Sequence, residues 1–425
     1  MPISSQFPGQ SMSNWSIGVK PRIELEADCH VCGRHLASIG VLWAGIHACA
    51  EFECPGCESR FLEDLPVGHA VGGPFRVDIR RNLLTGPSAS KAWFGEPLLR
   101  ALGNPDESEI KMAVEIRKPA SRVVLLNCID GLYGHCVLKL LNAATHLADP
   151  QFGLVVLVPS FLGWMVPDGV AEIWRVDMPL TRASRYFPDL HRRISREIER
   201  FGEVRLSRAY SHPPEFRLQD FTRVARHDFA ARNYRLTFIW RSDRLWLRES
   251  LVVRVCRKLN FVWVLLALQR RRIRHLFESA REDFPQATLT VAGVGRQGRF
   301  PGWIEDLRID KIDSAETERA LCRVYAESRV VVGVHGSNML LPSGHAGMCV
   351  DLMPEERWTN IAQDMLYAQE DFHGDARMSA YRYRFVPLDT SPRVIGTMIS
   401  GMLRHFQGVL LRFVSEIRGP SDLRR

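Results

Sequence analysis

The sequence lacks any apolar run long enough to cross a bilayer. Its most apolar stretch, Phe261–Leu268 (FVWVLLAL), has eight residues, whereas a membrane-spanning helix needs about 20. Basic residues flank this stretch, which favours a buried helical turn, with a surface contact to a membrane as the alternative. A secretory signal is also missing, because Met1–Lys20 is polar and rich in Ser, Pro and Gly. We therefore expect a cytoplasmic protein without a transmembrane segment, or one attached peripherally at the inner face of the membrane.

Internal repeats, a coiled coil and the composition of a disordered chain are absent as well. Hydrophobic residues make up 46% of the sequence and charged residues 24%, which is ordinary for a globular protein. A chain of 425 residues exceeds what one hydrophobic core usually supports, so two large lobes and a smaller module are expected. The net charge of +8 favours an anionic partner, and nucleotide phosphates, nucleic acids and anionic lipids all fit that sign.

Two Cys-x-x-Cys pairs give the most specific spacing in the sequence. Cys29 and Cys32 form the first pair, and Cys54 and Cys57 form the second. Two turns that each present two thiolates complete a tetrahedral zinc site, which would be structural because no coordination position stays open. Two disulfides are the alternative, although a reducing compartment is the simpler interpretation of the six other, scattered cysteines. The ribbon would either dock a protein partner or act only as a structural element.

Short apolar runs of strand length alternate with longer helical stretches from about residue 120 onward. The first series contains Arg122–Cys128 and Gly153–Val158, and a second series begins at Leu236–Trp240. Such alternation predicts parallel sheets with helices on both faces. We therefore predict an α/β protein with two doubly wound, Rossmann-like lobes across a cleft, plus a small N-terminal zinc ribbon. The expected domains are a flexible tail (1–26), the zinc ribbon (27–66), an acceptor lobe (85–230), a donor-binding lobe (231–390) and a C-terminal helix (391–418).

A buried strand leads into a turn of small residues at Val330–Pro342 (VVVGVHGSNMLLP). Gly336 lets a ligand approach the backbone closely. Ser337 would cap a helix whose free amides bind an anion, and His335 and Asn338 add side-chain donors. An α/β lobe holds a diphosphate in this way at the carboxyl ends of its strands. The alternative is an ordinary strand-to-helix turn with a buried histidine.

Other polar residues follow strands of the same predicted lobe. Arg241 and Arg244 come at the end of one strand, where a guanidinium can bind two phosphate oxygens at once. Arg296 lies in a glycine-containing loop after the next strand. Asp351 follows a further strand and would accept hydrogen bonds from ribose hydroxyls. A salt bridge from Arg241 to a neighbouring acid, and an ion pair of Asp351 with an arginine, are the alternatives.

The first lobe has a glycine-containing loop of its own, at 127–135 (NCIDGLYGH). Asp130 or His135 would serve as a general base if it reaches the proton of an acceptor hydroxyl. A turn-forming aspartate and a helix-capping histidine are the alternatives for these two residues.

The segment VVVGVHGSNMLLPSGHAGMCVDLMPEERWTNIAQDM (330–365) resembles the donor-binding segment of inverting GT-B glycosyltransferases, most closely of the family-61 type. Residues 240–244 and DGLYGHCVLKLLN (130–142) are similar to the fucosyltransferase-like branch of that superfamily. This resemblance implies inverting transfer from a nucleoside-diphosphate sugar donor to a glycan or other hydroxyl acceptor, with no catalytic metal. The rival hypothesis is a nucleic-acid-binding or complex-scaffolding protein that acts through the zinc ribbon, with inactive transferase lobes.

Overall fold

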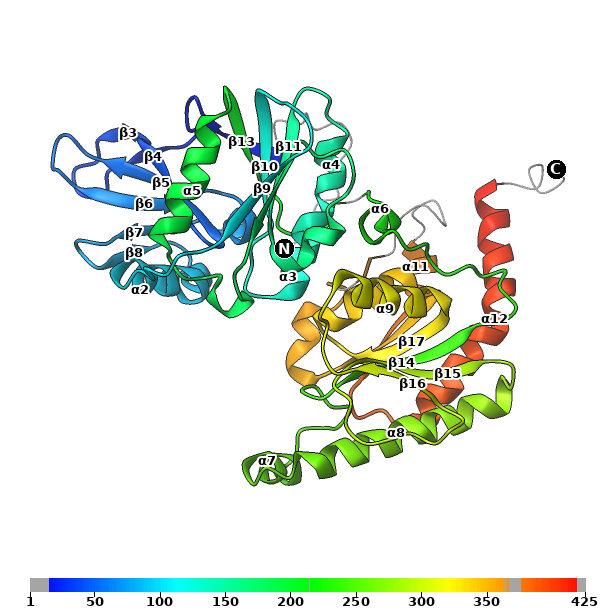
Figure 1. Ribbon diagram of the computed structural model, residues 1–425. Helices are drawn as coiled ribbons and strands as arrows, with labels where there is room; N and C mark the ends of the chain where they lie inside the picture. The colour runs from blue at the N-terminus through cyan, green and yellow to red at the C-terminus, as the bar shows by residue number, and fades with distance from the viewer. Residues whose placement is uncertain (1–14, 214, 364, 367–375, 419–425) are drawn as a thin grey trace. The chain divides into compact units, whose positions relative to one another are not determined.

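The computed structural model describes residues 15–213, 215–363, 365–366 and 376–418 (Figure 1). The chain divides into two compact units, Met1–Phe216 and Arg217–Arg425. Over the described residues, no helix combines the length and the apolarity that a membrane span requires. The predicted tail, residues 1–26, lies largely outside the described residues, and its last part forms strand β1 (Ser16–Lys20).

A six-stranded sheet forms the centre of the first unit within the described residues. Besides β1, its strands are β9 (Met112–Ile116), β10 (Arg122–Asn127), β11 (Gly153–Pro159), β12 (Glu172–Val176) and β13 (Glu203–Ser207). Their order is β1-β13-β10-β11-β12-β9, with antiparallel strands at the two edges and parallel strands between them. The apolar run Val123–Leu126 is buried throughout, as a central parallel strand requires. The helical segments of this part are α3 (Tyr133–Leu141), α4 (Ala143–Leu147), η4 (Ser160–Met165), η5 (Leu180–Arg182) and α5 (Pro188–Glu199).

The N-terminal part of the same unit is an antiparallel module. Its strands are β2 (Glu26–Asp28), β3 (His35–Ala37), β4 (Gly40–Ala44), β5 (His47–Glu53), β6 (Arg60–Asp64), β7 (Arg76–Asp78) and β8 (Leu83–Thr85). Strands β2 and β3 pair with each other, and β4 to β8 form one continuous sheet. The module therefore continues beyond residue 66, the predicted end of the zinc ribbon, through residues 67–84, which no predicted domain included. Its remaining elements are η2 (Gly68–Gly72), α1 (Ser88–Ser90), η3 (Lys91–Gly95) and α2 (Glu96–Gly103).

The antiparallel module shares a hydrophobic core with the central sheet. Trp43 and Phe52 of the module belong to the same buried cluster as Leu190 and Ile194 of α5. Helix α5 carries its apolar residues on one face and lies against β4. The module is thus anchored to the α/β part of its unit by apolar packing in addition to any metal.

The second unit is built on a fully parallel sheet. Its strands are β14 (Arg235–Arg241), β15 (Thr288–Val294), β16 (Glu305–Ile309), β17 (Ser328–Val334), β18 (Met348–Met353) and β19 (Tyr383–Pro387). Their order is β16-β15-β14-β17-β18-β19, so the chain winds outward from β14, crosses the sheet and winds outward again from β17. This is the strand order of a doubly wound Rossmann-type sheet, in which ligands bind beside the carboxyl ends of the two central strands.

Helices cover both faces of the second sheet. The helical segments of the second unit within the described residues are α6 (Leu218–Thr222), α7 (Leu251–Lys258), α8 (Val262–Asp283), α9 (Ala315–Glu327), η6 (Ser337–Met339), α10 (Leu340–His345), η7 (Glu355–Asn360), α11 (Ala376–Arg382) and α12 (Pro392–Arg418). Helix α9 lies on one face, and α8 and α12 pack against each other on the other (Figure 1). The structure thus confirms the predicted α/β class, with a mixed sheet in the first unit and a parallel sheet in the second.

Candidate functional site

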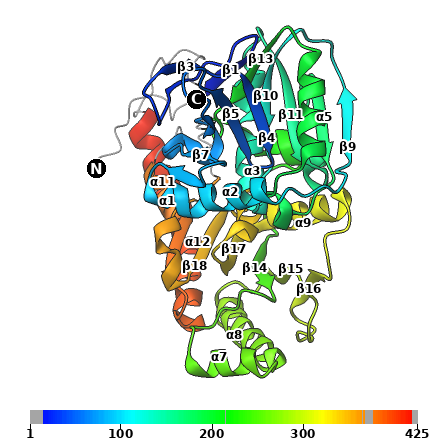
Figure 2. The same cartoon turned by 90° about the vertical axis from the view of Figure 1, so that its left-hand side faces the viewer.

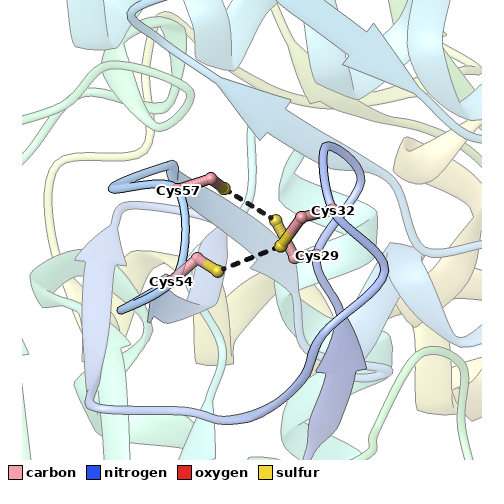
Figure 3. Close-up of side chains that lie close together, drawn as sticks. All are labelled: Cys29, Cys32, Cys54 and Cys57. Carbon is pink, nitrogen blue, oxygen red and sulfur yellow. Dashed lines mark hydrogen bonds between the residues drawn. The ribbon is translucent and has the colours of Figure 1, made fainter.

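Four cysteine side chains converge from two turns of the N-terminal module (Figure 3). Cys29 and Cys32 lie between β2 and β3, and Cys54 and Cys57 lie between β5 and β6. The Sγ atoms of Cys29 and Cys57 are 3.5 Å apart and those of Cys32 and Cys54 are 3.4 Å apart, so the four cysteines are free and not disulfide-bonded. Four sulfurs at zinc-bond length around one ion would be separated by about 3.8 Å. The cluster could therefore hold a metal ion such as zinc.

The two cysteine turns have the same backbone structure. The amide of Gly33 donates to the Cys29 carbonyl, and the amide of Glu58 donates to the Cys54 carbonyl, at 2.9 and 2.8 Å. Both donors have a positive φ, +72° and +56°. Burial raises the pKa of Cys29, but nearby backbone amides outweigh it and lower that pKa to about 6. The pKa of Cys54 is lowered as well, whereas, despite a backbone hydrogen bond, burial and the neighbouring thiols raise the pKa of Cys57 to about 12. One cysteine in each turn thus favours the thiolate, the form that binds metal.

A second polar cluster lies at the carboxyl end of β10, where the first sheet changes its winding direction. Asp130 follows this strand, and its Oδ2 lies 2.7 Å from Nε2 of His69 and 2.8 Å from Nζ of Lys139. Its Oδ1 lies 3.2 Å from Nδ1 of His135. The predicted pair, Asp130 and His135, is therefore joined by two residues that the sequence analysis did not identify.

The environment of Asp130 decides what this cluster can do. Burial alone would raise the pKa of Asp130, but the buried ammonium of Lys139 and the two imidazoles hold that pKa far below its usual range. A carboxylate that is fixed in an ion pair is a poor proton acceptor. The side chain of His135 is 24% exposed, against 5% for Asp130. His135 is therefore the member that could reach a substrate proton, and Asp130 could orient its ring.

His69 reaches the cluster from η2 in the N-terminal module. Its ring stacks on Phe94 at 4.6 Å and meets Tyr210 edge-on at 5.1 Å, and burial lowers its pKa, so it is neutral near pH 7. The signal in the sequence was a lone histidine within a glycine-bearing segment, VGHAVGG, which lies between the predicted zinc ribbon and the predicted acceptor lobe. Lys139 gave a clearer signal, as the single cation in the apolar run CVLKLLN.

The groups of His69, Asp130 and His135 are also close enough to ligate a metal ion, all within 4.8 Å of one another. Lys139 disfavours a metal ion at this cluster, because its ammonium already neutralises the Asp130 carboxylate that would bind the cation. A divalent ion there would lie next to a buried positive charge that no described acid other than Asp130 neutralises. The cluster therefore fits a hydrogen-bonded acid–base network better than a metal centre.

In the second unit, two arginines meet the turn that follows β17. Nη1 of Arg241 donates to Oδ1 of Asn338 at 3.1 Å, and Nη1 of Arg244 donates to the His335 carbonyl at 2.8 Å. Arg241 also forms the ion pair with Asp243 that the sequence analysis gave as an alternative. Gly336 has φ +146°, and a Cβ there would lie 2.0 Å from Nη1 of Arg244. The turn accepts this guanidinium only because it carries a glycine.

The surroundings of His335, Asp351 and Ser337 do not suit the donor contacts that were predicted for them. Nδ1 of His335 lies 2.7 Å from Oδ2 of Asp351, and the two side chains are only 3% and 0% exposed. The Tyr383 hydroxyl also donates to Asp351, and burial raises the pKa of this carboxyl. His335 and Asp351 are therefore buried beneath the turn. Asp351 has no accessible oxygen for the predicted hydrogen bonds from ribose hydroxyls. The prediction that Ser337 caps a helix is wrong, because Ser337 is the first residue of η6, and the N-cap residues of η6 and α10 are Gly336 and Met339, without a side-chain cap.

A cavity of about 500 Å³ opens at the carboxyl ends of the second sheet. Its base is formed by Val334 of β17, Met353 of β18 and Pro387 of β19, beside Arg244. Trp358 and Arg248 are also among its walls. Arg244 alone among the predicted donor residues lines it, whereas Arg296 is exposed in the loop after β15. The cavity thus lies over the carboxyl ends of β17, β18 and β19, and it borders the switch point between β14 and β17 through Arg244 and Val334.

No family model, curated protein or solved structure matches this chain.

Proposed function

We propose that the protein is an inverting, GT-B-type glycosyltransferase, which moves a sugar from a nucleoside-diphosphate sugar to a hydroxyl of a glycan or other acceptor. The observation that carries this proposal is the convergence of Arg241 and Arg244 on the 335–338 turn, at the carboxyl ends of the two central strands β14 and β17. Guanidinium groups at this position suit the oxygens of a diphosphate.

The cavity next to Arg244 supports a nucleotide as the ligand. Its volume of about 500 Å³ suits a ligand of that size. Trp358 and Leu245 give apolar surface for a base, while Arg244 and Arg248 give positive charge for phosphates. In such a reaction the arginines would stabilise the charge that develops on the leaving nucleoside diphosphate. The arginines would thus take the role that a metal ion has in metal-dependent transferases, so the proposed reaction needs no catalytic metal.

The cluster around Asp130 would supply the general base in this proposal. His135 would remove the proton of the acceptor hydroxyl, with Asp130 fixing the ring through Nδ1 and leaving Nε2 to face the substrate. The proposal requires that His135 acts on the acceptor and the donor turn acts on the donor in the same reaction. The zinc ribbon would then be a structural element that keeps the module of His69 in place.

The donor site can be tested by calorimetric titration of the full chain with a panel of nucleoside-diphosphate sugars. We expect one donor to bind, and Arg244→Ala to weaken it at least tenfold, because a charge-assisted hydrogen bond contributes about 1.5–3 kcal/mol. Arg323→Ala, on the exposed side of α9, is the matched control and should leave binding unchanged. Absence of any donor binding, together with salt-dependent binding of DNA, would instead support the nucleic-acid hypothesis.

A further inference from the structure

An apolar stripe faces solvent on α7 and at the start of α8. Leu251 is 70% exposed, Val255 44% and Leu259 56%, and these residues are spaced four apart, so they lie along one side of the helix. Trp263, 67% exposed, follows at the beginning of α8. Isolated exposed apolar residues are ordinary, but a continuous stripe with a tryptophan marks a contact surface.

The opposite side of α7 attaches the helix to its unit. Val253 is buried in the core of the second unit, and the Ser250 hydroxyl caps the helix by accepting from the Val253 amide. Both views show α7 at the periphery of this unit, away from its sheet (Figures 1 and 2). The apolar stripe therefore points outward from a helix that is fixed in place.

Positive charge surrounds the apolar stripe. Residues 248–263, which contain the stripe, include four Arg and Lys residues and a single acid, Glu249, which pairs with Arg257 at 2.9 Å. Arg254 and Lys258 are exposed on α7 next to the stripe, and neither forms an ion pair among the described residues. A helix with outward apolar residues, flanking cations and an aromatic residue has the composition of one that lies in a membrane interface.

We propose that α7 and the beginning of α8 dock this protein on an anionic lipid surface. The leucines, valine and Trp263 would enter the boundary between headgroups and acyl chains, while Arg254 and Lys258 would contact lipid phosphates. A nucleic acid would match the charge but would leave the aliphatic stripe uncovered, because aliphatic side chains offer bases no stacking partner. Arg248 and Arg257 also line the cavity, so docking would place this part of the cavity wall beside the lipid surface.

Vesicle co-sedimentation of the full chain tests this docking. We expect binding to phosphatidylcholine vesicles that contain about one third phosphatidylglycerol, weak binding to pure phosphatidylcholine, and release at high salt. Two charge reversals, Arg254→Glu with Lys258→Glu, should weaken binding at least tenfold, since each cation contributes about 1 kcal/mol at such a surface. Arg192→Glu with Arg196→Glu, also four residues apart on α5, is the matched control and should bind as the parent does.

The apolar contact has its own pair of variants. Trp263→Ser should reduce vesicle binding several-fold, whereas Trp93→Ser, at a tryptophan that is 76% exposed in the first unit, should not. Brominated lipids should quench less of the total fluorescence in Trp263→Ser than in the parent. Equal binding by all variants, or binding that ignores lipid charge, would overturn the proposal. So would sedimentation velocity showing a dimer that dissociates in Trp263→Ser, because a second copy would then cover the stripe.

Discussion

Nε2 of His69 lies 2.7 Å from Oδ2 of Asp130, although the two residues are 61 positions apart in the chain. His69 comes from the antiparallel module that carries the four cysteines, and Asp130 comes from the central sheet of the same unit. The two parts share one hydrophobic core, which fixes η2 beside the end of β10. The module therefore contributes a side chain to the candidate acid–base cluster, and its stability should matter for that cluster.

Asp130→Asn should destabilise the first unit strongly. The substitution leaves the ammonium of Lys139 buried without its counter-charge, which typically costs about 3–5 kcal/mol. Urea unfolding at pH 7 measures this loss. Because the folded pKa of Asp130 is depressed, its contribution is fully present above the unfolded pKa of about 3.9 and is lost as pH falls below it. The difference in the free energy of unfolding between parent and variant should consequently become smaller below pH 4. A difference that stays constant would contradict the ion-pair assignment.

His135→Ala should lower kcat about 100-fold or more while the affinity for the donor stays unchanged. This expectation rests on the proposed function, in which a positioned general base contributes about 10²–10⁴ in rate. Steady-state kinetics, with calorimetric donor binding beside them, separate the two effects. His146→Ala is the control for a buried histidine of the same unit whose side chain contacts Ser207, away from the cluster. Loss of donor affinity in His135→Ala would contradict the assignment of His135 as the base that acts on the acceptor.

The sequence predicted strands well where both faces are buried and poorly where one face is polar. β10, β11, β14 and β17 were expected because continuous apolar runs of strand length have few other interpretations. β16, with the sequence EDLRI, and β13, with EVRLS, were missed because edge or short strands carry charges that resemble loop composition.

Site residues close together in the sequence were found more readily than those joined by the fold. The four cysteines and the pair Asp130 and His135 stand within local motifs, whereas His69 joins them only through tertiary structure. The buried pairing of His335 with Asp351 was also missed, because side-chain burial depends on packing between strands that local sequence does not report.

The purified protein should contain one tightly bound zinc ion per chain. Cys32→Ser removes a thiolate from the cluster without opening the core, because Cys32 is exposed, and metal analysis should then show loss of the ion. Cys49→Ala, in the same antiparallel module but outside the cluster, should retain it. Limited proteolysis should cleave the 27–66 segment faster in Cys32→Ser alone. Equal metal content in the two variants would contradict metal binding by the four cysteines.

Gly336→Ala should displace Arg244 and cost stability. The added Cβ would lie 2.0 Å from Nη1 of Arg244, at a backbone conformation with φ +146° that costs a side-chain residue about 1–3 kcal/mol. Thermal unfolding measures the stability loss, and titration with the donor that the parent binds measures the displacement. Gly302→Ala, where nothing lies within 4 Å of an added Cβ, is the matched control. A variant as stable and as tight in binding as the parent would show that the turn accepts a side chain.

His345→Leu should flatten the acid side of the stability profile. His345 is fully buried in α10, and burial lowers its pKa to about 3. Since the unfolded side chain has a pKa of about 6.5, the unfolded state takes up a proton that the folded state refuses, and stability falls as pH drops from about 6.5 toward 3. Between pH 7 and pH 5 this uptake costs the parent about 2 kcal/mol that the leucine variant does not lose. Urea unfolding of both proteins at the two pH values measures the difference, and parallel pH profiles would show that His345 is protonated in the folded protein as well.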